Sequence, residues 1–338
     1  MRRATVMAAV LSLSAFAAGT LHAQAPAQRD LKIAMIAKSS ANFLFLSARQ
    51  GADEAAQALS RKHGIKVEVL WLTPTKEDAT LQVASVAQAI KLRAHAILIA
   101  CSDSAKLTPA LNEAVDKGLA VMTFDADAPA SKRFAYYGPD DADLGDKVLT
   151  DLAAQLSGQG KIAILAGNPD AMNLRARVDA VKKSAAAKFK GIEVVEVVNH
   201  VETPQEAAAA MLRVNAARPD LAGWALVGGW PLFRSSQTPA LMADLQKRKL
   251  KVVSVDGLPE ELIYVEKGLV PVLWAQPTYL WGKVGVETIV DKVVFKKTIP
   301  ERIRMDPVRV SRENLGSWSR QLKAWGFTGL PAEYLALK

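Results

Sequence analysis

The sequence has very little cysteine and histidine. Cys101 is the single cysteine among 338 residues, and none of the four histidines has another four positions away. An internal disulfide is therefore excluded, and a zinc site has no support. Cys101 ends an apolar run, which predicts a small buried side chain with no catalytic role. We expect neither a metal nor a cofactor.

The motifs of common enzyme classes are also lacking. There is no nucleophile elbow, no phosphate-binding loop and no dinucleotide-binding glycine pattern. Asp125 with Asp127, or Asp140 with Asp141, would supply paired carboxylates for glycoside chemistry, but neighbours along a loop point in different directions. No histidine, serine or cysteine stands beside a suitable base. We therefore expect a binding protein, and a carbohydrate-acting enzyme is the less favoured alternative.

A basic nucleic-acid groove is absent as well, although the formal net charge is +9. The lysines and arginines are scattered near expected helix ends, without interleaved aromatic residues. Such a distribution indicates a solvated surface, and we expect no nucleic-acid partner.

Long hydrophobic runs are confined to the N-terminus. Arg2 and Arg3 precede an almost wholly apolar stretch at residues 4–18, and Ala23 offers a small residue for cleavage. The run is shorter than the roughly 20 residues of a membrane-spanning helix, so residues 1–23 are predicted to be a signal peptide. No cysteine follows the run, which argues against a lipid anchor, and the predicted location is the periplasm. The remaining chain exceeds what one core usually holds, so two lobes are expected.

After the leader, apolar runs of strand length alternate with segments of helical periodicity. Aliphatic strands separated by helices are typical of parallel sheets that helices cover on both faces. The rhythm begins again after the segment 134–139, which predicts two doubly wound lobes of the α/β class. The expected strands are 31–37, 67–72, 96–100, 119–124, 161–166, 192–198, 222–227 and 250–255; the expected helices are 43–62, 77–93, 107–117, 143–156, 171–189, 204–217 and 239–248.

Polar and aromatic residues follow many of these strands. Ligands bind beyond the carboxyl ends of the strands in such sheets, where loops and helix N-termini converge. Carboxylates, amides and guanidinium groups hydrogen-bond hydroxyls, and aromatic rings cover the C–H faces of a sugar. The candidate ligand-binding residues are Lys38, Asn42, Phe45, Asp125, Arg175, Trp230, Asp256 and Gln276.

Two arginines compete for one of these positions. Arg175 and Arg177 are two residues apart, which is about 200° around a helix, so only one of them is expected to face the cleft. Arg175 is our choice. Trp230 follows Gly228 and Gly229, and we expect its ring to form a wall of the ligand cleft. The alternative is that the ring fills a hydrophobic gap in the core.

Five short motifs, in this order and spacing, resemble the periplasmic ribose- and galactose-type sugar-binding proteins of ABC transporters. The resemblance spans residues 31–306 and rests on Asn42-Phe43-Leu44-Phe45 with Gly51, Thr123-Phe124-Asp125, Asn173-Leu174-Arg175-Ala176-Arg177, Val253-Ser254-Val255-Asp256-Gly257, and Ala275-Gln276-Pro277 with Gly282 and Gly285.

The resemblance implies a type I periplasmic binding protein fold, with two Rossmann-like lobes joined by a hinge of three strands. Lobe 1 would comprise residues 31–140 and 277–305, and lobe 2 residues 141–276 and 306–338. It also implies ligand contacts from Asn42, Phe45, Asp125, Arg175, Asp256 and Gln276. The implied partners are a small sugar or polyol and the membrane permease of an ABC transporter, and we expect a monomer.

The chain departs from the ribose-type pattern at three places. Ala126 stands where ribose binders carry an arginine, and Gly228-Gly229-Trp230 replaces a segment with an asparagine. Lys38 is similar to the lysine after the first strand of autoinducer-2 receptors. These changes are compatible with a sugar ligand but do not indicate ribose itself.

Sugar-responsive repressors share the fold, but the few residues between the leader and residue 31 leave no room for a helix-turn-helix. A periplasmic receptor for a chemoreceptor or sensor kinase stays open.

Overall fold

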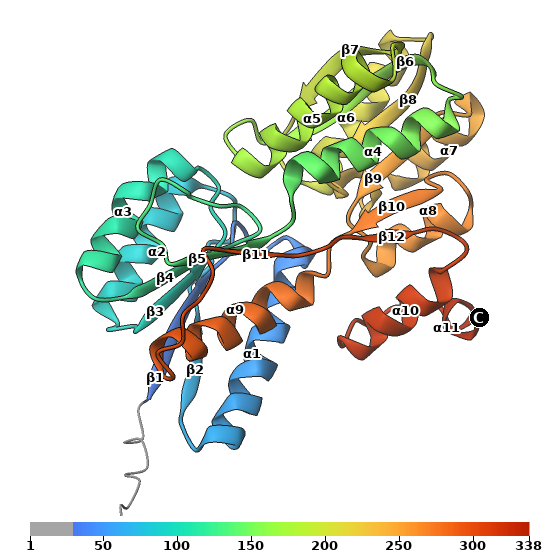
Figure 1. The fold of residues 1–338 in the computed structure, drawn as a ribbon. Coiled ribbons are helices and arrows are strands. Elements are labelled where there is room, and N and C mark those ends of the chain that lie inside the picture. Colours follow the sequence, from blue (N-terminus) through green and yellow to red (C-terminus); the bar gives the residue numbers. More distant parts are fainter. Residues whose placement is uncertain (1–29, 338) are drawn as a thin grey trace, which may run out of the picture.

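The computed structural model describes residues 30–337, so the predicted signal peptide at residues 1–23 lies outside the described residues. Strands and helices alternate, as the periodicity of the sequence predicts. Figure 1 shows two layered units, each a sheet with helices packed on it, joined by segments that cross between them.

The first sheet has six parallel strands in the order β11-β5-β4-β3-β1-β2. Five strands come from the first 138 residues, and β11 comes from near the C-terminus. The elements of this unit are β1 (Leu31–Ile36), α1 (Phe43–His63), β2 (Val67–Trp71), α2 (Ala79–Lys91), β3 (Ala96–Ile99), α3 (Ser104–Asp116), β4 (Ala120–Phe124), β5 (Ala135–Gly138), α9 (Thr278–Val293) and β11 (Arg302–Arg304).

The second sheet has the order β12-β10-β9-β8-β6-β7, and only the short β12 is antiparallel to its neighbour. Its elements are α4 (Asp141–Gln155), β6 (Gln159–Gly167), α5 (Met172–Lys188), β7 (Gly191–Asn199), α6 (Pro204–Ala217), β8 (Leu221–Leu226), the 3-10 turn η1 (Trp230–Leu232), α7 (Thr238–Arg248), β9 (Lys251–Val255), the 3-10 turn η2 (Pro259–Glu261), α8 (Leu262–Glu266), β10 (Val272–Ala275), β12 (Val308–Val310), α10 (Leu315–Ala324) and α11 (Ala332–Ala336).

The two sheets repeat one topology. Within each, the second, first, third, fourth and fifth strands of the unit lie side by side in that order, and a C-terminal strand completes the edge. The chain passes between the sheets three times, from β5 to α4, from β10 to α9 and from β11 to β12. The predicted fold class, two doubly wound parallel-sheet lobes joined by three segments, is confirmed.

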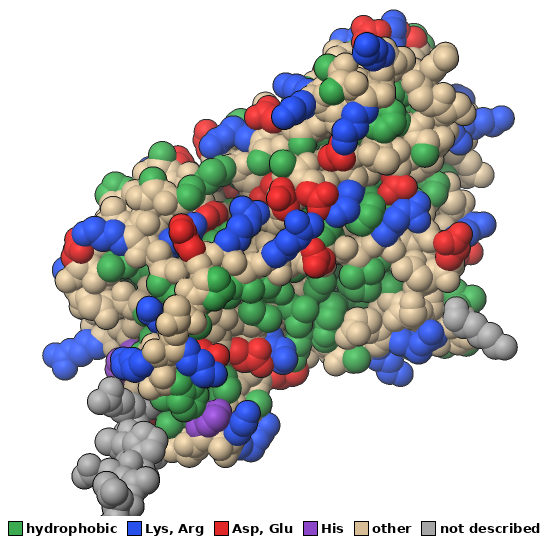
Figure 2. All heavy atoms as spheres, viewed as in Figure 1, with side chains coloured by type: hydrophobic (Ala, Val, Ile, Leu, Met, Phe, Trp, Pro, Cys, Tyr) green, Lys and Arg blue, Asp and Glu red, His purple; other side chains and the backbone are tan. Residues whose placement is uncertain are grey.

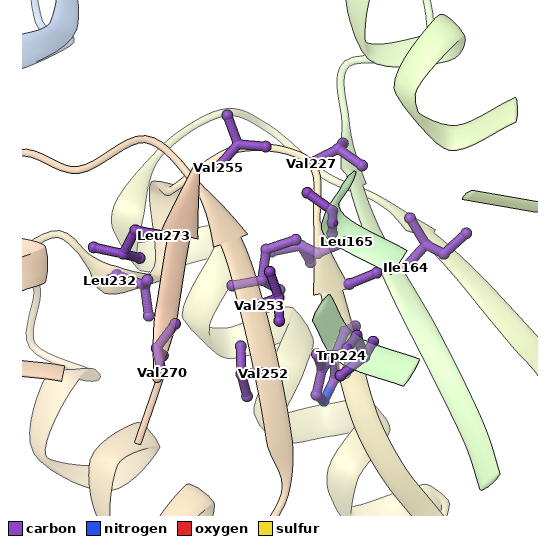
Figure 3. Close-up of a cluster of buried hydrophobic side chains, with 14 of the residues drawn as sticks. Ile164, Leu165, Trp224, Val227, Leu232, Val252, Val253, Val255, Val270 and Leu273 are labelled. Atoms are coloured by element: carbon purple, nitrogen blue, oxygen red, sulfur yellow. The ribbon is translucent and has the colours of Figure 1, made fainter. Parts of the chain in front are cut away.

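Aliphatic side chains fill the space between each sheet and its helices. All four residues of β3 are buried, which is why these strands read as unbroken apolar runs. Figure 3 shows the corresponding core of the second lobe, where Val252 and Val253 of β9 pack beside Trp224 of β8 and Leu273 of β10. Close packing fixes the ends of the strands, and those ends carry the polar residues described below.

Charged residues of both signs share the surface over the crossing segments, as Figure 2 shows across the middle of the molecule. Arg304, the last residue of β11, contacts Asp143 of α4 at 2.9 Å and Asp306 at 2.7 Å. Such exposed pairs contribute little to stability, about 0–1 kcal/mol each.

Within residues 30–337, no helix has the length and apolar character that a membrane crossing requires.

Candidate functional site

Two aspartates occupy equivalent places in the two lobes. Asp125 follows β4 and Asp256 follows β9, each the fourth strand of its unit. Both have a left-handed backbone, with φ of 55° and 76°. Each backbone N–H donates to the neighbouring strand, to Tyr137 O at 3.1 Å and to Trp274 O at 3.0 Å. A non-glycine residue in this conformation costs on the order of 1 kcal/mol or more, and such residues cluster at binding sites.

Arg177 of α5 is the centre of a hydrogen-bond network in the second lobe. Its Nε donates to Asp141 Oδ1 at 2.9 Å, its Nη1 to the Val227 carbonyl at 3.0 Å and its Nη2 to Gln276 Oε1 at 3.1 Å. These partners follow β5, β8 and β10, so one guanidinium group joins three strand ends. The planar fork of donors in arginine suits such a junction.

The network continues to the second aspartate. Gln276 Nε2 donates to Asp256 Oδ1 at 2.7 Å, and the backbone N–H of Gly229 donates to Asp256 Oδ2 at 2.9 Å. Burial raises the pKa of Asp256, and these two hydrogen bonds to the carboxylate oppose the rise.

The first aspartate is held from both lobes. Lys38 Nζ lies 3.9 Å from Asp125 Oδ2, and Asn173 Nδ2 of α5 donates to Asp125 Oδ1 at 3.2 Å. The Tyr136 hydroxyl donates to the Asp125 carbonyl at 2.8 Å. Asn173 therefore links the lobes directly, and its own Oδ1 is buried without a hydrogen-bond partner. A buried acceptor without a hydrogen-bond partner is rare in a folded protein, and a ligand could supply the missing donor.

These side chains form a buried polar cluster, each 5 % exposed or less. Buried charges are stable only when they are paired and hydrogen-bonded. Burial raises the pKa of Asp125, against the attraction of Lys38 and Arg177. Burial lowers the pKa of Lys38, but Asp125, Glu77 and Glu202 outweigh that effect and raise it overall. The cluster comprises Lys38, Asp125, Asn173, Arg177, Asp256 and Gln276.

A second polar contact joins the lobes near Lys38. Asn168, which follows β6, donates from Nδ2 to Glu77 Oε1 of the first lobe at 3.0 Å. Its backbone N–H donates to Glu202 Oε1 at 3.2 Å. Burial and the neighbouring Glu77 raise the pKa of Glu202 to about 8. The two carboxyl groups therefore approach each other across the lobe boundary.

Another carboxyl group lies beneath the Asp256 turn. Glu261 is fully buried, and its Oε2 accepts from the backbone N–H of Leu258 at 2.6 Å, while its Oε1 has no partner. Burial, and secondarily Asp256, raises the pKa of Glu261 well above the usual value. Gly229 lies so close that an added Cβ would be 2.3 Å from Glu261 Oε1. This glycine therefore permits the close approach of the backbone to both acids.

Four of the residues predicted from the sequence meet in the buried polar cluster: Lys38, Asp125, Asp256 and Gln276. Asn42 instead caps α1, where its side chain accepts from the backbone N–H of Leu44 at 3.1 Å. Phe45 packs in the core of the first lobe, with its ring centroid 6.3 Å from Phe124 and 5.9 Å from Trp281. A ligand contact from either residue stays a prediction.

Of the two arginines, Arg177 and not the predicted Arg175 lies in the buried polar cluster, so a ligand contact from Arg175 stays a prediction. Arg175 is exposed and donates from Nη1 to the Pro169 carbonyl at 2.9 Å, whereas Arg177 is 2 % exposed and lies in the cluster. Arg175 and Arg177 do lie on different sides of α5, as their spacing predicts. However, the helix buries the face that carries Asn173 and Arg177 and leaves Arg175 exposed. Sequence spacing fixes the angle between two residues of a helix and leaves the rotation of the helix open.

Trp230 lies in the core of the second lobe and is 4 % exposed. Its ring packs edge-to-face on His200, with centroids 5.0 Å apart, and it also contacts Gly228 and Gly167. A Cβ at Gly228 would be 2.5 Å from the indole, and one at Gly167 would be 2.6 Å from it. This placement matches the core alternative for the ring, and a role as cleft wall stays a prediction.

Several residues in and around the cluster could not be identified from the sequence, because their sequence context gives little indication of a binding role. Asn173 belongs to a motif named above, but its position within that motif gave no reason to select it. Asp141 stands beside Asp140, a spacing that indicates at most a carboxylate pair, and Tyr136 and Glu261 follow no predicted strand. The tertiary structure, and not local spacing, brings these side chains to Arg177, Asp125 and Asp256.

A pocket of about 490 Å³ opens at the lobe boundary beside the crossing from β5 to α4, and Tyr136, Asp141 and Asn173 line its inner end. Among residues 30–337, no group of three or more His, Cys, Asp or Glu side chains is arranged to hold a metal ion. Cys101 is 1 % exposed, as predicted.

Comparison with known proteins places the chain in a family. A family model described as "Periplasmic binding protein domain" matches residues 33–297. The chain therefore belongs to the periplasmic binding protein family, and the predicted class is confirmed.

The relatives include sugar-binding proteins. The chain is 28% identical over 264 residues to the D-ribose/D-allose-binding protein of Pseudomonas aeruginosa, covering 75% of this chain and 77% of that protein. It is 23% identical over 274 residues to the ribose import binding protein RbsB of Bacillus subtilis, covering 80% and 84%. A solute-binding protein of an ABC transporter from Burkholderia graminis, solved with D-arabinose, is 25% identical with a TM-score of 0.75, covering 86% of this chain and 98% of that chain.

Proposed function

We propose that this protein captures a monosaccharide or a similar polyol between its lobes and delivers it to the permease of an ABC transporter. The observation that carries the proposal is the buried polar cluster, in which Asp125, Asp256 and Arg177 converge from the ends of strands and helices of both lobes. The relatives named for D-ribose, D-allose and D-arabinose support the sugar class.

The chemistry of the cluster suits hydroxyl groups. Each hydroxyl donates one hydrogen bond and accepts others, and the cluster offers carboxylate acceptors beside guanidinium, ammonium and amide donors. A ligand would replace the bonds that now join Arg177 to Gln276 and Asn173 to Asp125. Charge-assisted bonds of this kind are roughly twice as strong as neutral ones.

Burial of the cluster also suggests a mechanism. Side chains exposed by 5 % or less cannot receive a ligand unless the lobes separate. Rotation about the three crossing segments would open the cleft, and closure would remove the ligand hydroxyls from water. Because an unpaired buried hydroxyl or partner group is costly, closure would select against analogues that lack one hydroxyl.

The remaining assignments belong to the same proposal. Lobe 1 would take residues 31–140 and 277–305, and lobe 2 residues 141–276 and 306–338. Residues 1–23 would direct export and be removed after Ala23, the mature protein would act in the periplasm as a monomer, and it would catalyse no reaction. These assignments rest on the leader pattern of the sequence and on the family.

A thermal-shift screen of residues 24–338 tests the proposal. We expect at least one pentose, hexose, deoxysugar or polyol to raise the melting temperature, because a ligand that binds only the folded form stabilises it by mass action. A hundredfold excess of ligand over Kd corresponds to about 2.7 kcal/mol. If no compound of these four classes shifts the transition at millimolar concentration, the sugar assignment is wrong.

A further inference from the structure

The C-terminal segment contacts both lobes. After β12 the chain forms α10, whose Trp318 and Leu322 are buried against the second lobe. Residues 325–328 then leave α10 and lie against α1 of the first lobe, where Gly326 and Phe327 line a pocket of about 280 Å³ together with Phe43, Leu46 and Gln50. Figure 1 shows α10 and α11 in red, below β12 and apart from the sheet.

At its first end the segment holds the turn that carries Asp256. The indole Nε1–H of Trp318 donates to the Gly257 carbonyl at 2.7 Å. A Cβ at Gly257 would lie 2.6 Å from Ala275 Cβ and 3.3 Å from the same indole nitrogen, so this turn is enclosed on two sides. Trp318 therefore fixes the residue that directly follows the left-handed Asp256.

At its second end the segment stacks on the first lobe. The rings of Trp325 and Tyr279 lie 5.7 Å apart and nearly parallel, at 7°. Tyr279 is the second residue of α9, and its hydroxyl donates to Glu54 Oε2 of α1 at 2.6 Å. Gly326 has a φ of 82° and approaches Gln50 so closely that a Cβ would be 1.9 Å from its Nε2. Phe327 packs against the cores of both lobes.

The two ends are joined by one aromatic contact. Trp318 and Trp325 meet edge-to-face, with centroids 5.7 Å apart at 86°. A continuous path of packed side chains thus runs from the Asp256 turn through Trp318, Trp325 and Tyr279 to α1. None of these residues belongs to the three segments that cross between the lobes.

We propose that residues 315–328 form a brace across the lobes that favours the closed arrangement and sets how readily the cleft opens. Separating the lobes pulls α1 and the start of α9 away from the segment that is anchored on the second lobe by Trp318. The stack of Trp325 on Tyr279 and the contact of Gly326 with Gln50 must then be broken or moved. An aromatic pair of this kind shifts an equilibrium by roughly two- to tenfold.

The test measures the distance between the lobes without ligand. Spin labels are attached at Lys106→Cys on α3 and Lys182→Cys on α5, two exposed positions on different lobes, in a Cys101→Ala background. Pulsed dipolar spectroscopy then compares the parent with Trp325→Ala, Trp325→Phe and Trp71→Ala. Trp71 is a partly buried tryptophan of β2 that packs on Arg49 within the first lobe, so it is the matched control.

The brace predicts that Trp325→Ala raises the population of longer distances roughly two- to tenfold, that Trp325→Phe restores most of the parent distribution and that Trp71→Ala leaves it unchanged. Circular dichroism confirms that each variant is folded. Parent-like distances in Trp325→Ala, or an equal shift in Trp71→Ala, would overturn the brace. The proposal rests on the proposed function only in that closure serves ligand capture. The distances are read without sugar, so the failure of either proposal is visible by itself.

Discussion

Asp125 and Asp256 show how single residues define the candidate site. Each adopts a left-handed backbone at the end of the fourth strand of its lobe, and each is held by groups that the rest of the chain brings to it. Arg177 lies between them and donates to three separate strand ends. The cluster therefore depends on one buried guanidinium group more than on any other side chain.

The pair Arg177 and Arg175 supplies the sharpest residue-scale prediction. Arg177→Ala leaves Asp141 and the Val227 carbonyl buried without their donor, so we expect it to cost about 3–5 kcal/mol of stability and to abolish sugar binding. Arg175→Ala removes an exposed side chain and should stay within about 0.5 kcal/mol of the wild type. Denaturant unfolding and ligand titration of both variants measure this. Equal effects of the two changes would refute the assignment of Arg177 to the cluster.

Trp230 supports a second prediction at this scale. Truncation to alanine should cost about 3–5 kcal/mol, because the ring fills the space between His200, Gly167 and Gly228. Trp230→Phe should keep most of the stability. If Trp230→Phe also changes neither ligand-induced fluorescence nor affinity, the ring is core alone and the predicted cleft wall fails.

Four of the six residues of the buried polar cluster could be predicted from the sequence, and there is a physical reason why the other two could not. Lys38, Asp125, Asp256 and Gln276 follow strands, and strand ends can be read from apolar runs. Arg177 and Asn173 lie on a helix whose rotation about its axis is set by packing, so spacing alone could not choose between Arg175 and Arg177. Glu261 could not be found because an acid two residues after a proline is typical of an exposed turn.

At the scale of elements, α1 and α9 cross at two glycines. A Cβ at Gly282 would lie 1.7 Å from the Ala48 carbonyl oxygen, and one at Gly51 would lie 2.0 Å from that of Tyr279. The backbones of the two helices are therefore in direct contact, and this contact places Tyr279 and the crossing from β10 beside the cleft. The two glycines are among the residues that carry the family resemblance.

Gly282→Ala should push the helices apart and cost about 1–3 kcal/mol or more of unfolding free energy. The neighbouring Lys283→Ala, which removes only a partly exposed pair with Glu287, should cost less than about 0.5 kcal/mol. Urea denaturation of the two variants provides the comparison. A Gly282→Ala protein as stable as the wild type would contradict the helix contact.

The loops at the lobe boundary predict a dependence on pH. The pKa of Glu202 is raised to about 8, above its usual value of 4.5, so the folded protein binds this proton more tightly than the unfolded chain does. Its contribution to stability is complete below about 4.5 and is lost as the pH rises through about 8. Glu202→Gln keeps a neutral acceptor for the Asn168 N–H and removes the titrating group.

Melting temperatures of wild type and Glu202→Gln, recorded from pH 4 to 9, check this sign. The wild-type curve should fall more steeply than the variant curve between pH 5 and 9. Parallel curves over that interval would show that Glu202 titrates at its ordinary pKa. The charged groups that act on Glu202 are Glu77, Lys38 and Asp125, and all three are retained in both proteins.

Most elements up to β9 could be predicted within a few residues, because buried strands and amphipathic helices differ in period. The helix predicted at 43–62 is α1 (Phe43–His63), and the helix predicted at 204–217 is α6. The short β5, β11 and β12 could not be foreseen, since three or four residues carry no period and their pairing depends on the distant crossings. The same holds for α10 and the brace that follows it.

At the scale of the whole molecule, two copies of one topology face each other with the carboxyl ends of their strands. This arrangement brings hydrogen-bonding partners together from distant parts of the chain, with Asp125 and Asn173 separated by 48 positions and Arg177 and Gln276 by 99. The lobes meet at buried polar groups, and the crossing segments and the brace determine how they separate. The proposed function as a closing receptor rests on that geometry and on membership of the periplasmic binding protein family.

Isothermal titration calorimetry tests the central claim most directly. Residues 24–338 are titrated with the sugar that gives the largest thermal shift, beside the Asp125→Ala and Asp256→Ala variants. We expect one site per chain in the wild type and a loss of at least ten- to a hundredfold in affinity for each variant, because a charge-assisted bond to the ligand contributes roughly 1.5–3 kcal/mol. Unchanged affinity in both folded variants would place the ligand outside the buried polar cluster and refute the proposed binding site.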